Sequence, residues 1–555
     1  MPSHRFCNSQ KANYALAALS VILGSFALFA FNNLSTPNTD ELYQTLSVKH
    51  YSDSPLAMLT FWIGNIWTRI FGFSILSLRN LLSTEQLITV GIATYWLWRH
   101  TRNIRLCAAA FLLTCVLFRT STYFLYNWDA GAYIFDTAAL ILILSTIANP
   151  KPYKFWLCGA ALTLVAMARI PTASFIPCAF VILWLACRHK GIPSRLLLDV
   201  AGGMTLCFLF VSTVMCGSPS AYCRAFAPEN IISGHSPLSD TSYLLYRLRL
   251  IVSTTPAKWF PALGCALLPI VMAKCSRSAS VIIIVTWTLA SLLLIFSFDY
   301  AFTLASIWLG MDAPIGIAIL LAIPTAWLFI GKIWTLRYCL RLELWACALF
   351  MLCVIVGSDA FIERLNSAFM LLPALAIVWP ATKGTLRKYI KLMLILSLVC
   401  FSSLFAAYSC IFSLKAHEQP VHEKHKVFRG LRLHPEFLKE FGNAEEAIKL
   451  VREQKIPYLY IGDRKIAELT YGTDKGPNFH NFHKHPFVLE NWLEMKPVLI
   501  DSIDAVVYVP ETPYPELPAV VADIRSSGFT DSIAAGNAIV LSRPSLLQLR
   551  DKGAH

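Results

Sequence analysis

The feature that most constrains this chain is a series of long apolar stretches in its first three quarters. A membrane span needs about 20 apolar residues. Each span must also be helical, because lipid offers nothing to pair with an open backbone. Thirteen candidate spans lie near residues 14–31, 86–98, 104–118, 131–148, 155–170, 173–187, 197–216, 260–273, 279–297, 313–331, 342–357, 366–381 and 391–412. The pattern predicts a polytopic α-helical membrane protein with about 13 transmembrane helices.

The composition of the chain agrees with a membrane protein. Of its 555 residues, 56% are hydrophobic and 14% are charged, whereas about 25% charged residues is usual for soluble domains. The formal net charge of +14 comes from short basic clusters between the apolar stretches. That distribution indicates membrane topology and membrane lipids as neighbours, and no nucleic-acid partner.

The basic clusters predict the orientation of the chain, because short cytoplasmic loops are enriched in Lys and Arg. They occupy every second connection, at residues 5–11, 99–105, 151–154, 188–195, 274–277, 331–341 and 383–391. We therefore expect a cytoplasmic N-terminus, followed by an uncleaved first span. The opposite, extracytoplasmic side then receives residues 32–85, 119–130, 217–259, 298–312, 358–366 and everything after the last span.

The last part of the chain differs from the rest. Residues 415–555 contain no cysteine, no candidate span and eight of the thirteen histidines. Short apolar runs predict strands at 457–463, 504–510 and 538–544, and helical periodicity predicts helices at 444–454 and 516–528. We expect two domains: a transmembrane domain over residues 1–414, and a small soluble extracytoplasmic α/β domain over residues 415–555.

The first outer loop, residues 32–85, is far longer than a connector between two helices requires. It carries the acidic residues Asp40, Glu41 and Asp53 close to the end of the first span. Acids in an exposed loop are often only solvated side chains. At the boundary between water and lipid, however, they lie where the phosphate and headgroup of a lipid-linked substrate would be presented.

Part of this loop is itself apolar. Residues 56–74 (LAMLTFWIGNIWTRIFGFS) have helical periodicity but are too polar and too interrupted to span a bilayer. We expect an interfacial helix, with Trp62 and Trp67 at the depth of the lipid headgroups. The acids and this helix would together form a ledge at the membrane surface.

Four patches of the sequence resemble a known family. The first span is followed by Asp40-Glu41 with Tyr43 nearby, by residues 51–56, which are similar to Y-x-[DE]-x-P-L, and by a helix ending FGFS…LR. This order resembles the opening of the GT-C glycosyltransferases, in particular the protein O-mannosyltransferase-like group that includes the lipid A aminoarabinose transferase.

The other three patches follow in the family's order. Residues 126–148 are similar to its second outer loop, with Asp129 as the first choice and Asp136 as the second choice for the loop acid. Residues 159–177 place Arg169 at the family's basic position, and residues 363–377 (ERLNSAFMLLPALAI) are similar to its R-Y-x-L-P segment. The chain departs from the family at Ser54-Pro55-Leu56, where K-P-P is usual, so the particular sugar and metal stay open.

The resemblance implies an enzyme, a glycosyltransferase that moves a sugar from a polyprenyl-phosphate donor to a glycolipid, glycan or protein hydroxyl. The transfer would take place, with inversion, on the outer face of a bacterial inner membrane. By the same resemblance Asp40 is the catalytic base, with Glu41 as its neighbour and fallback. Binding of the donor phosphate or the substrate falls to Tyr43, Asp53, Asp129, Arg169 and Arg364. The cofactor is unknown, and a divalent metal that bridges Asp53, Asp129 and the phosphate is compatible with this chemistry.

Two other functional classes compete with this interpretation. A transporter or lipid flippase places ionisable groups near the bilayer midplane, often in duplicated halves. Here the charges gather at the ends of the spans, and no internal repeat is visible. A polysaccharide polymerase or ligase uses a large later outer loop, and residues 217–259 are long enough to keep that alternative open.

Overall fold

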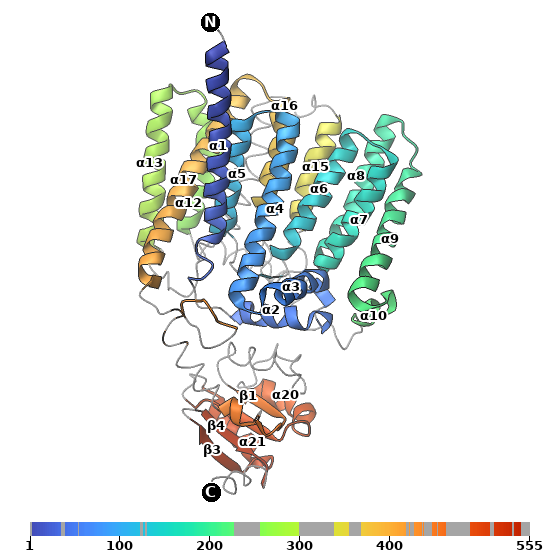
Figure 1. Cartoon of the computed structure of the whole chain (residues 1–555), viewed down its shortest axis with the longest axis vertical. Coiled ribbons are helices and arrows are strands. Elements are labelled where there is room, and N and C mark those ends of the chain that lie inside the picture. The colour runs from blue at the N-terminus through green and yellow to red at the C-terminus, as the bar shows by residue number, and fades with distance from the viewer. Residues whose placement is uncertain are drawn as a thin grey trace.

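The fold is a bundle of helices with a small α/β domain at one end (Figure 1). The computed structural model describes residues 3–34, 39–53, 55–121, 126–127, 130–226, 256–298, 338–353, 368–417, 421, 427–433, 435, 437, 447–451, 453–461, 489–510, 515–535 and 538–544. The statements below concern these residues.

Twelve of the thirteen predicted spans coincide with a helix of the bundle. These helices are α1 (Ser3–Phe29), α4 (Ile75–Thr101), α5 (Ile104–Ser121), α6 (Tyr133–Ala148), α7 (Pro152–Ala168), α8 (Phe175–Lys190), α9 (Leu196–Cys216), α12 (Pro256–Met272), α13 (Arg277–Phe298), α15 (Tyr338–Cys353), α16 (Ala368–Ala381) and α17 (Gly384–His417). The remaining predicted span, residues 313–331, lies outside the described residues.

The apolar surface of the bundle identifies it as a multi-pass membrane protein. Five helical stretches are long and apolar enough to cross a bilayer: Lys11–Phe29, Ile170–Lys190, Leu196–Cys216, Arg277–Ile295 and Gly384–Ala407. Large apolar side chains stand exposed on them, and Phe210 and Leu293 are each 70% exposed. Helices that expose such side chains along their length require an apolar surrounding such as lipid tails.

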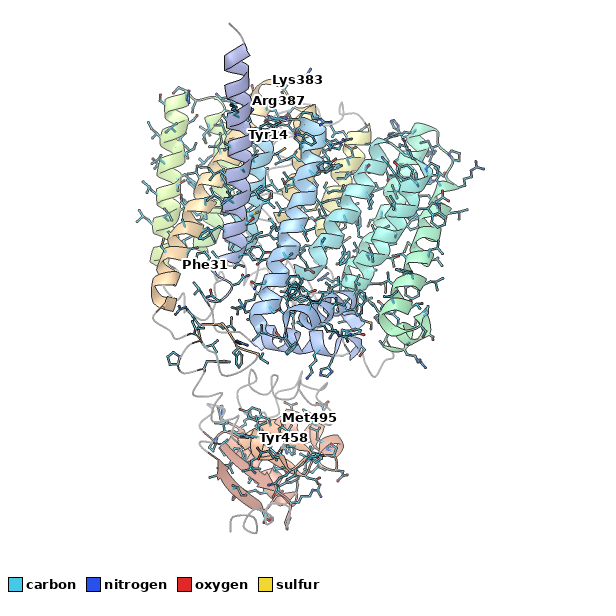
Figure 2. All side chains as sticks on the ribbon, in the orientation of Figure 1. Tyr14, Phe31, Lys383, Arg387, Tyr458 and Met495 are labelled. Carbon is cyan, nitrogen blue, oxygen red and sulfur yellow. The ribbon has the colours of Figure 1, made fainter. Side chains whose placement is uncertain are left out.

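Successive helices run in opposite directions, so the connections fall at two ends of the bundle (Figure 1). Lys383 and Arg387, which belong to one of the basic clusters, lie at the same end as the N-terminus (Figure 2). Phe31 and the C-terminal domain lie toward the opposite end. The basic connections therefore lie at one end, which we call the basic end, and α2, α3 and the C-terminal domain lie at the other.

The segment predicted as the first outer loop forms a short helical layer across the end of the bundle that faces the C-terminal domain (Figure 1). It consists of α2 (Thr39–Lys49), the 3₁₀ turns Tyr51–Asp53 and Pro55–Ala57, and α3 (Met58–Phe71). Helix α3 coincides with the predicted interfacial helix. It buries Met58, Leu59 and Phe61 against the bundle and exposes Ile70 and Phe71. An exposed apolar edge is what a helix at the water–lipid boundary needs.

Two neighbouring helices of the bundle, α7 and α9, are in direct backbone contact. A Cβ atom at Gly159 would overlap the carbonyl oxygen of Val200, and one at Gly203 would overlap that of Trp156. Only glycine allows two helices to approach this closely, as in the small-residue contacts common between membrane helices.

The C-terminal domain contains a four-stranded mixed sheet with the order β1-β2-β4-β3. Strand β1 (Tyr458–Ile461) is parallel to β2 (Ala505–Tyr508), whereas β4 (Ala538–Ser542) is antiparallel to both β2 and β3 (Asp531–Ala535). β1, β2, β4 and helix α21 (Leu517–Ser526) coincide with predicted elements. Strand β3 and helix α20 (Leu489–Leu499) were not predicted. Within the predicted helix at 444–454, residues 447–451 are helical.

Helices α20 and α21 are joined through one carboxylate. The Asp523 carboxyl accepts a hydrogen bond from Trp492 Nε1 at 2.7 Å and pairs with Lys496 Nζ at 2.9 Å. Burial alone would raise the pKa of Asp523, but the hydrogen bonds from Lys496 and Trp492 and the charge of Lys496 together lower it below its ordinary value.

Candidate functional site

Six charged side chains are buried among the described residues, and all of them fall between residues 41 and 169: Glu41, Arg79, Glu85, Arg119, Asp136 and Arg169. They share one end of the bundle, because α4 and α6 begin there and α5 and α7 end there (Figure 1). Burying a charge costs several kcal/mol unless it is paired. A cluster of ionisable groups in such a position therefore marks a candidate functional site.

The best defined member of this group is an ion pair between α2 and α4. Arg79 Nε donates to Glu41 Oε1, and Arg79 Nη2 donates to Glu41 Oε2, each at 2.6 Å. The two side chains are 1% and 3% exposed. Two parallel charge-assisted hydrogen bonds fix both groups in direction as well as in distance. The pair therefore fixes α2, which carries Asp40, against the second turn of α4.

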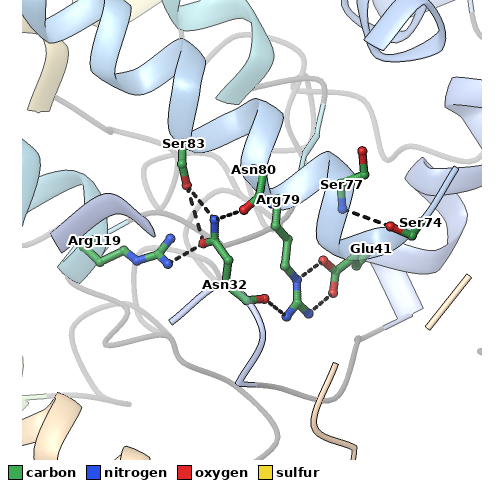
Figure 3. Close-up of polar contacts among 8 residues, drawn as sticks. All are labelled: Asn32, Glu41, Ser74, Ser77, Arg79, Asn80, Ser83 and Arg119. Atoms are coloured by element: carbon green, nitrogen blue, oxygen red, sulfur yellow. Dashed lines mark hydrogen bonds and ion pairs between the residues drawn. The ribbon is translucent and has the colours of Figure 1, made fainter. Parts of the chain in front are cut away.

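Asn32, just beyond the end of α1, holds two of the buried arginines (Figure 3). Its main-chain oxygen accepts from Arg79 Nη1 at 2.8 Å, and its side-chain oxygen accepts from Arg119 Nη2 at 2.6 Å. The Asn32 amide nitrogen donates to Asn80 at 2.8 Å and to Ser83 at 3.0 Å. One buried asparagine thus sets the relative positions of two guanidinium groups from two helices.

A second polar group connects α3 with the end of α7 and with Tyr126, which lies between α5 and α6 in the chain. Thr60 donates from Oγ1 to the Ala168 carbonyl at 3.0 Å, and the Thr60 carbonyl accepts from the Tyr126 hydroxyl at 2.6 Å. Arg169 follows Ala168 and donates to Thr172 Oγ1 at 3.1 Å. Through Thr60, the interfacial helix α3 lies beside Arg169 on one side and Tyr126 on the other.

Tyr126 is a neutral hydrogen-bonding group in this arrangement. Burial, followed by the neighbouring Glu85 carboxyl, raises the pKa of the Tyr126 phenol well above its ordinary value. The phenol therefore keeps its proton at physiological pH and can orient the Thr60 carbonyl, but it cannot serve as a base.

The six buried charges comprise three carboxyl groups and three guanidinium groups, an arrangement suited to anionic substrates. Arginine binds phosphate oxygens with the same two-pronged geometry that Arg79 shows toward Glu41. Among the described residues, no three His, Cys, Asp or Glu side chains are grouped closely enough to hold a metal ion. The described part of the site offers arginines for neutralising a phosphate.

The structure brings some of the predicted site residues together. Glu41 and Arg169 are buried at the same end of the bundle. By their main chain, Asp40 and Tyr43 lie in α2, and Asp53 ends the 3₁₀ turn Tyr51–Asp53. Asp129 and Arg364 lie outside the described residues. Asp136, the second choice for the loop acid, is buried in the first turn of α6.

Sequence reasoning missed Asn32, Arg79, Glu85 and Arg119. A signal was present, since Arg79, Ser83 and Gln86 follow one another at helical spacing and form a polar face on a helix that is otherwise apolar. Arg79 also belongs to the FGFS…LR pattern that carried the family resemblance. Nothing in the sequence indicated that this face would be buried.

Comparisons with known proteins find similarity among solved structures alone. No protein-family model matches the chain, and no curated protein matches it. Among solved structures, the chain is similar to the crystal structure of ArnT from Cupriavidus metallidurans bound to undecaprenyl phosphate. The identity is 11% and the TM-score is 0.43, over 96% of this chain and 98% of that chain. A likeness at this level carries no information about the residues of the site.

Proposed function

We propose that this chain is a membrane glycosyltransferase that moves a sugar from a polyprenyl-phosphate donor to a hydroxyl group of a glycolipid, glycan or protein. Transfer takes place at the end of the bundle that carries α2, α3 and the C-terminal domain. This end faces the outside of the inner membrane, and the N-terminus faces the cytoplasm. The chain is then a GT-C enzyme with about 13 spans and a soluble domain from residue 415 onward.

The observation that carries the proposal is the gathering of three buried arginines and three buried carboxyl groups at this single end. The reaction needs cations for the departing phosphate and a carboxylate for the proton of the acceptor hydroxyl. Both kinds of group lie at the end of the bundle that carries α3, where a lipid-linked substrate would present its headgroup. The motif resemblance of the first outer loop supports the same reaction.

The chemistry follows from the placement of these groups. The acceptor oxygen attacks the anomeric carbon while the carbon–oxygen bond to phosphate breaks, and polyprenyl phosphate leaves with the bonding electron pair. Asp40, next to Glu41 in α2, takes the hydroxyl proton. Glu41 has both oxygens bound to Arg79, so we assign it the role of orienting α2. A single displacement inverts the sugar carbon.

Arginines of the site neutralise the leaving phosphate in this proposal. Arg169 retains the role expected from the resemblance. Asn32 holds Arg79 and Arg119 at the same end of the bundle; Arg119 joins Arg169 there, and Arg79, whose Nε and Nη2 are bound to Glu41, contributes its positive charge to the same site. Tyr43, Asp53, Asp129 and Arg364 stay proposed substrate contacts on the resemblance alone.

The position of the buried charges favours this function over transport. A transporter needs its ionisable groups near the bilayer midplane. Here Glu41 lies in α2, outside the spans, and Arg79, Arg119, Asp136 and Arg169 lie within two turns of a helix end or just beyond it, whereas Glu85 alone of the six lies deeper, in the first half of α4.

Replacement of Asp40 by Asn tests the proposal in living cells. Surface glycolipids and glycoproteins are compared between wild type, D40N and the control D501N, which alters an exposed acid of the C-terminal domain. We expect one surface modification to disappear in D40N at normal protein level and to persist in D501N. Unchanged products in D40N would contradict the proposal, and a change only in glycan chain length would assign the chain to the polymerases.

A further inference from the structure

We propose that Asn32 is a positioning residue for two arginines of the site, and that residues 427–433 hold it in place from the C-terminal domain. We call residues 427–433 the docking segment. The physical coupling is independent of the reaction, whereas its consequence for a phosphate-bearing lipid rests on the proposed function.

The first contact of the docking segment is with the beginning of α4. A helix starts with main-chain N–H groups that have no partner within the helix. Ser74 caps one of them, since its Oγ accepts from Ser77 N at 3.1 Å. The N–H of Ile75 donates instead to the Val427 carbonyl at 3.0 Å. The docking segment therefore supplies part of the cap of the helix that carries Arg79 one turn later.

The second contact is with the residue after Asn32. The N–H of Arg432 donates to the Asn33 carbonyl at 2.8 Å. The carbonyl of Asn32 accepts from Arg79, and its side chain accepts from Arg119 (Figure 3). Two successive carbonyl groups thus face different partners, one toward the buried arginines and one toward the docking segment.

Apolar packing secures these two contacts. Phe428 and Leu431 are fully buried, and they belong to the same apolar cluster as Ile75 and the core of the C-terminal sheet. Leu76 packs against this cluster. The core of the C-terminal domain thus extends onto the first turn of α4.

Gly430 shows how closely the docking segment fits. Its φ angle is +85°, in the left-handed region that favours glycine, and a Cβ atom there would lie 2.8 Å from Leu76 Cδ2. A side chain at this position would be strained and would displace the Leu76 side chain from its packing against the docking segment. Gly430 is therefore a point at which the docking can be loosened by one methyl group.

Together these contacts make the arginine positions depend on the C-terminal domain. Arg79 is held by its helix, by Glu41 and by the Asn32 carbonyl, and two of these three supports adjoin the docking segment. Such coupling is reciprocal. Loosening of the docking segment should therefore release Asn32, and loss of the Asn32 side chain should release the docking segment.

Hydrogen exchange on the full chain in lipid nanodiscs tests this reciprocity. N32A removes the side chain that binds Arg119, Asn80 and Ser83, and its control N33A keeps the Asn33 main-chain carbonyl. G430A introduces the clash, and its control G528A has similar strain, at a φ of +99°, with no neighbouring atom within 4 Å. We expect exchange to accelerate about 5-fold or more in residues 427–433 of N32A and in residues 75–79 of G430A. Independent exchange of the two segments would overturn the coupling.

Binding of undecaprenyl phosphate, titrated into the same nanodiscs, tests the positioning role. Displaced arginines should weaken its binding about 5-fold in N32A and G430A and leave N33A and G528A unchanged. A merely structural effect lowers the fraction of protein that binds, not the affinity of the remainder, so unchanged affinity would refute the positioning role. If the wild-type protein does not bind this lipid, the proposed function is wrong, and the exchange data alone decide the coupling.

Discussion

The two ends of the helical bundle use their charged side chains in opposite ways. At the basic end, Lys190 donates to the Ala148 carbonyl at 2.7 Å and Lys388 donates to the Ala273 carbonyl at 2.7 Å, so lysines cap the last turns of α6 and α12. Arg188 lies over the ring of Trp184 at 5.6 Å. At the end that carries α2 and α3, six charged side chains are buried, and Glu41 and Arg79 form a buried ion pair.

The difference between the two ends separates charges that position helices in the membrane from charges that belong to a candidate site. Cations at helix C-termini and beside tryptophan rings are stabilised by the helix dipole, by the ring and by water. Such cations stabilise the ends of the helices. Buried ion pairs have no such general use and often stabilise a fold no better than apolar residues would. Their retention at one end therefore points to chemistry there.

The largest expected effect comes from breaking the buried ion pair. Arg79→Ala leaves the Glu41 carboxylate buried without the guanidinium that binds it. We expect this to lower the free energy of unfolding by roughly 3–5 kcal/mol. Thermal unfolding in detergent measures the loss, and Arg188→Ala at the basic end is the matched control, with a cost below about 1 kcal/mol. Equal stability of the two variants would contradict the claim that the ends differ in how much they depend on a single charge.

Removing both partners of the pair sharpens the same contrast. The double variant Glu41→Leu/Arg79→Met replaces two buried charges by apolar groups of similar size. We expect it to recover most of the stability lost in Arg79→Ala. Sugar transfer, measured by analysis of surface glycans, should stay absent, because Arg79 belongs to the proposed phosphate site. Restored transfer in the double variant would show that the pair serves only to stabilise the fold.

The Lys496–Asp523 pair of the C-terminal domain offers a water-exposed counterpart of the buried pair. The pKa of Asp523 is lowered in the folded domain. The ionised carboxylate therefore stabilises the folded domain at pH values above the ordinary Asp pKa, and this stabilisation is lost as the pH falls through the pKa of the folded state. Partial exposure limits the effect to about 1 kcal/mol or less. Hydrogen exchange of residues 489–499, corrected for intrinsic rates, should show this loss below about pH 4 in wild type and not in Asp523→Asn. The same pH dependence in both would contradict the assignment.

The smallest expected effect belongs to a capping lysine of the basic end. Lys190→Met removes the donor to the Ala148 carbonyl but keeps the aliphatic part of the side chain. We expect a loss of about 0.5 kcal/mol, the usual size of a charge at a helix C-terminus, and unchanged sugar transfer. The same thermal-unfolding measurement checks it, and a loss as large as that of Arg79→Ala would mean that the basic end also depends on individual charges.

The positions of the helices were readable from the sequence, but the depth of the site was not. Apolar stretches reveal where lipid surrounds a helix, so the predicted span at 86–98 marks only the second half of α4 (Ile75–Thr101). The first turns of α4 are polar because they face other protein segments, and this made Arg79 and Glu85 look like loop residues. Pairing of Glu41 with Arg79 bridges 38 positions of sequence, and no local pattern encodes such a contact.

The C-terminal domain shows the same limit in another form. Strands β1, β2 and β4 are continuous apolar segments that are buried on both faces, and their composition alone predicts them. Strand β3 has the sequence DSIAA and forms because β4 offers it a partner. Helix α20 contains Pro497, which weakens any helical pattern. Both elements depend on tertiary neighbours that sequence periodicity does not reveal.

The backbone contact between α7 and α9 has a mechanical consequence. Gly159 lies against the Val200 carbonyl, and Gly203 lies against that of Trp156. Two helices in such contact bend together, and the pair is stiffer than either helix would be alone. Arg169 directly follows the last residue of α7, so its main chain is attached to this stiff pair. Thermal bending of α7 should therefore displace the Arg169 main chain very little.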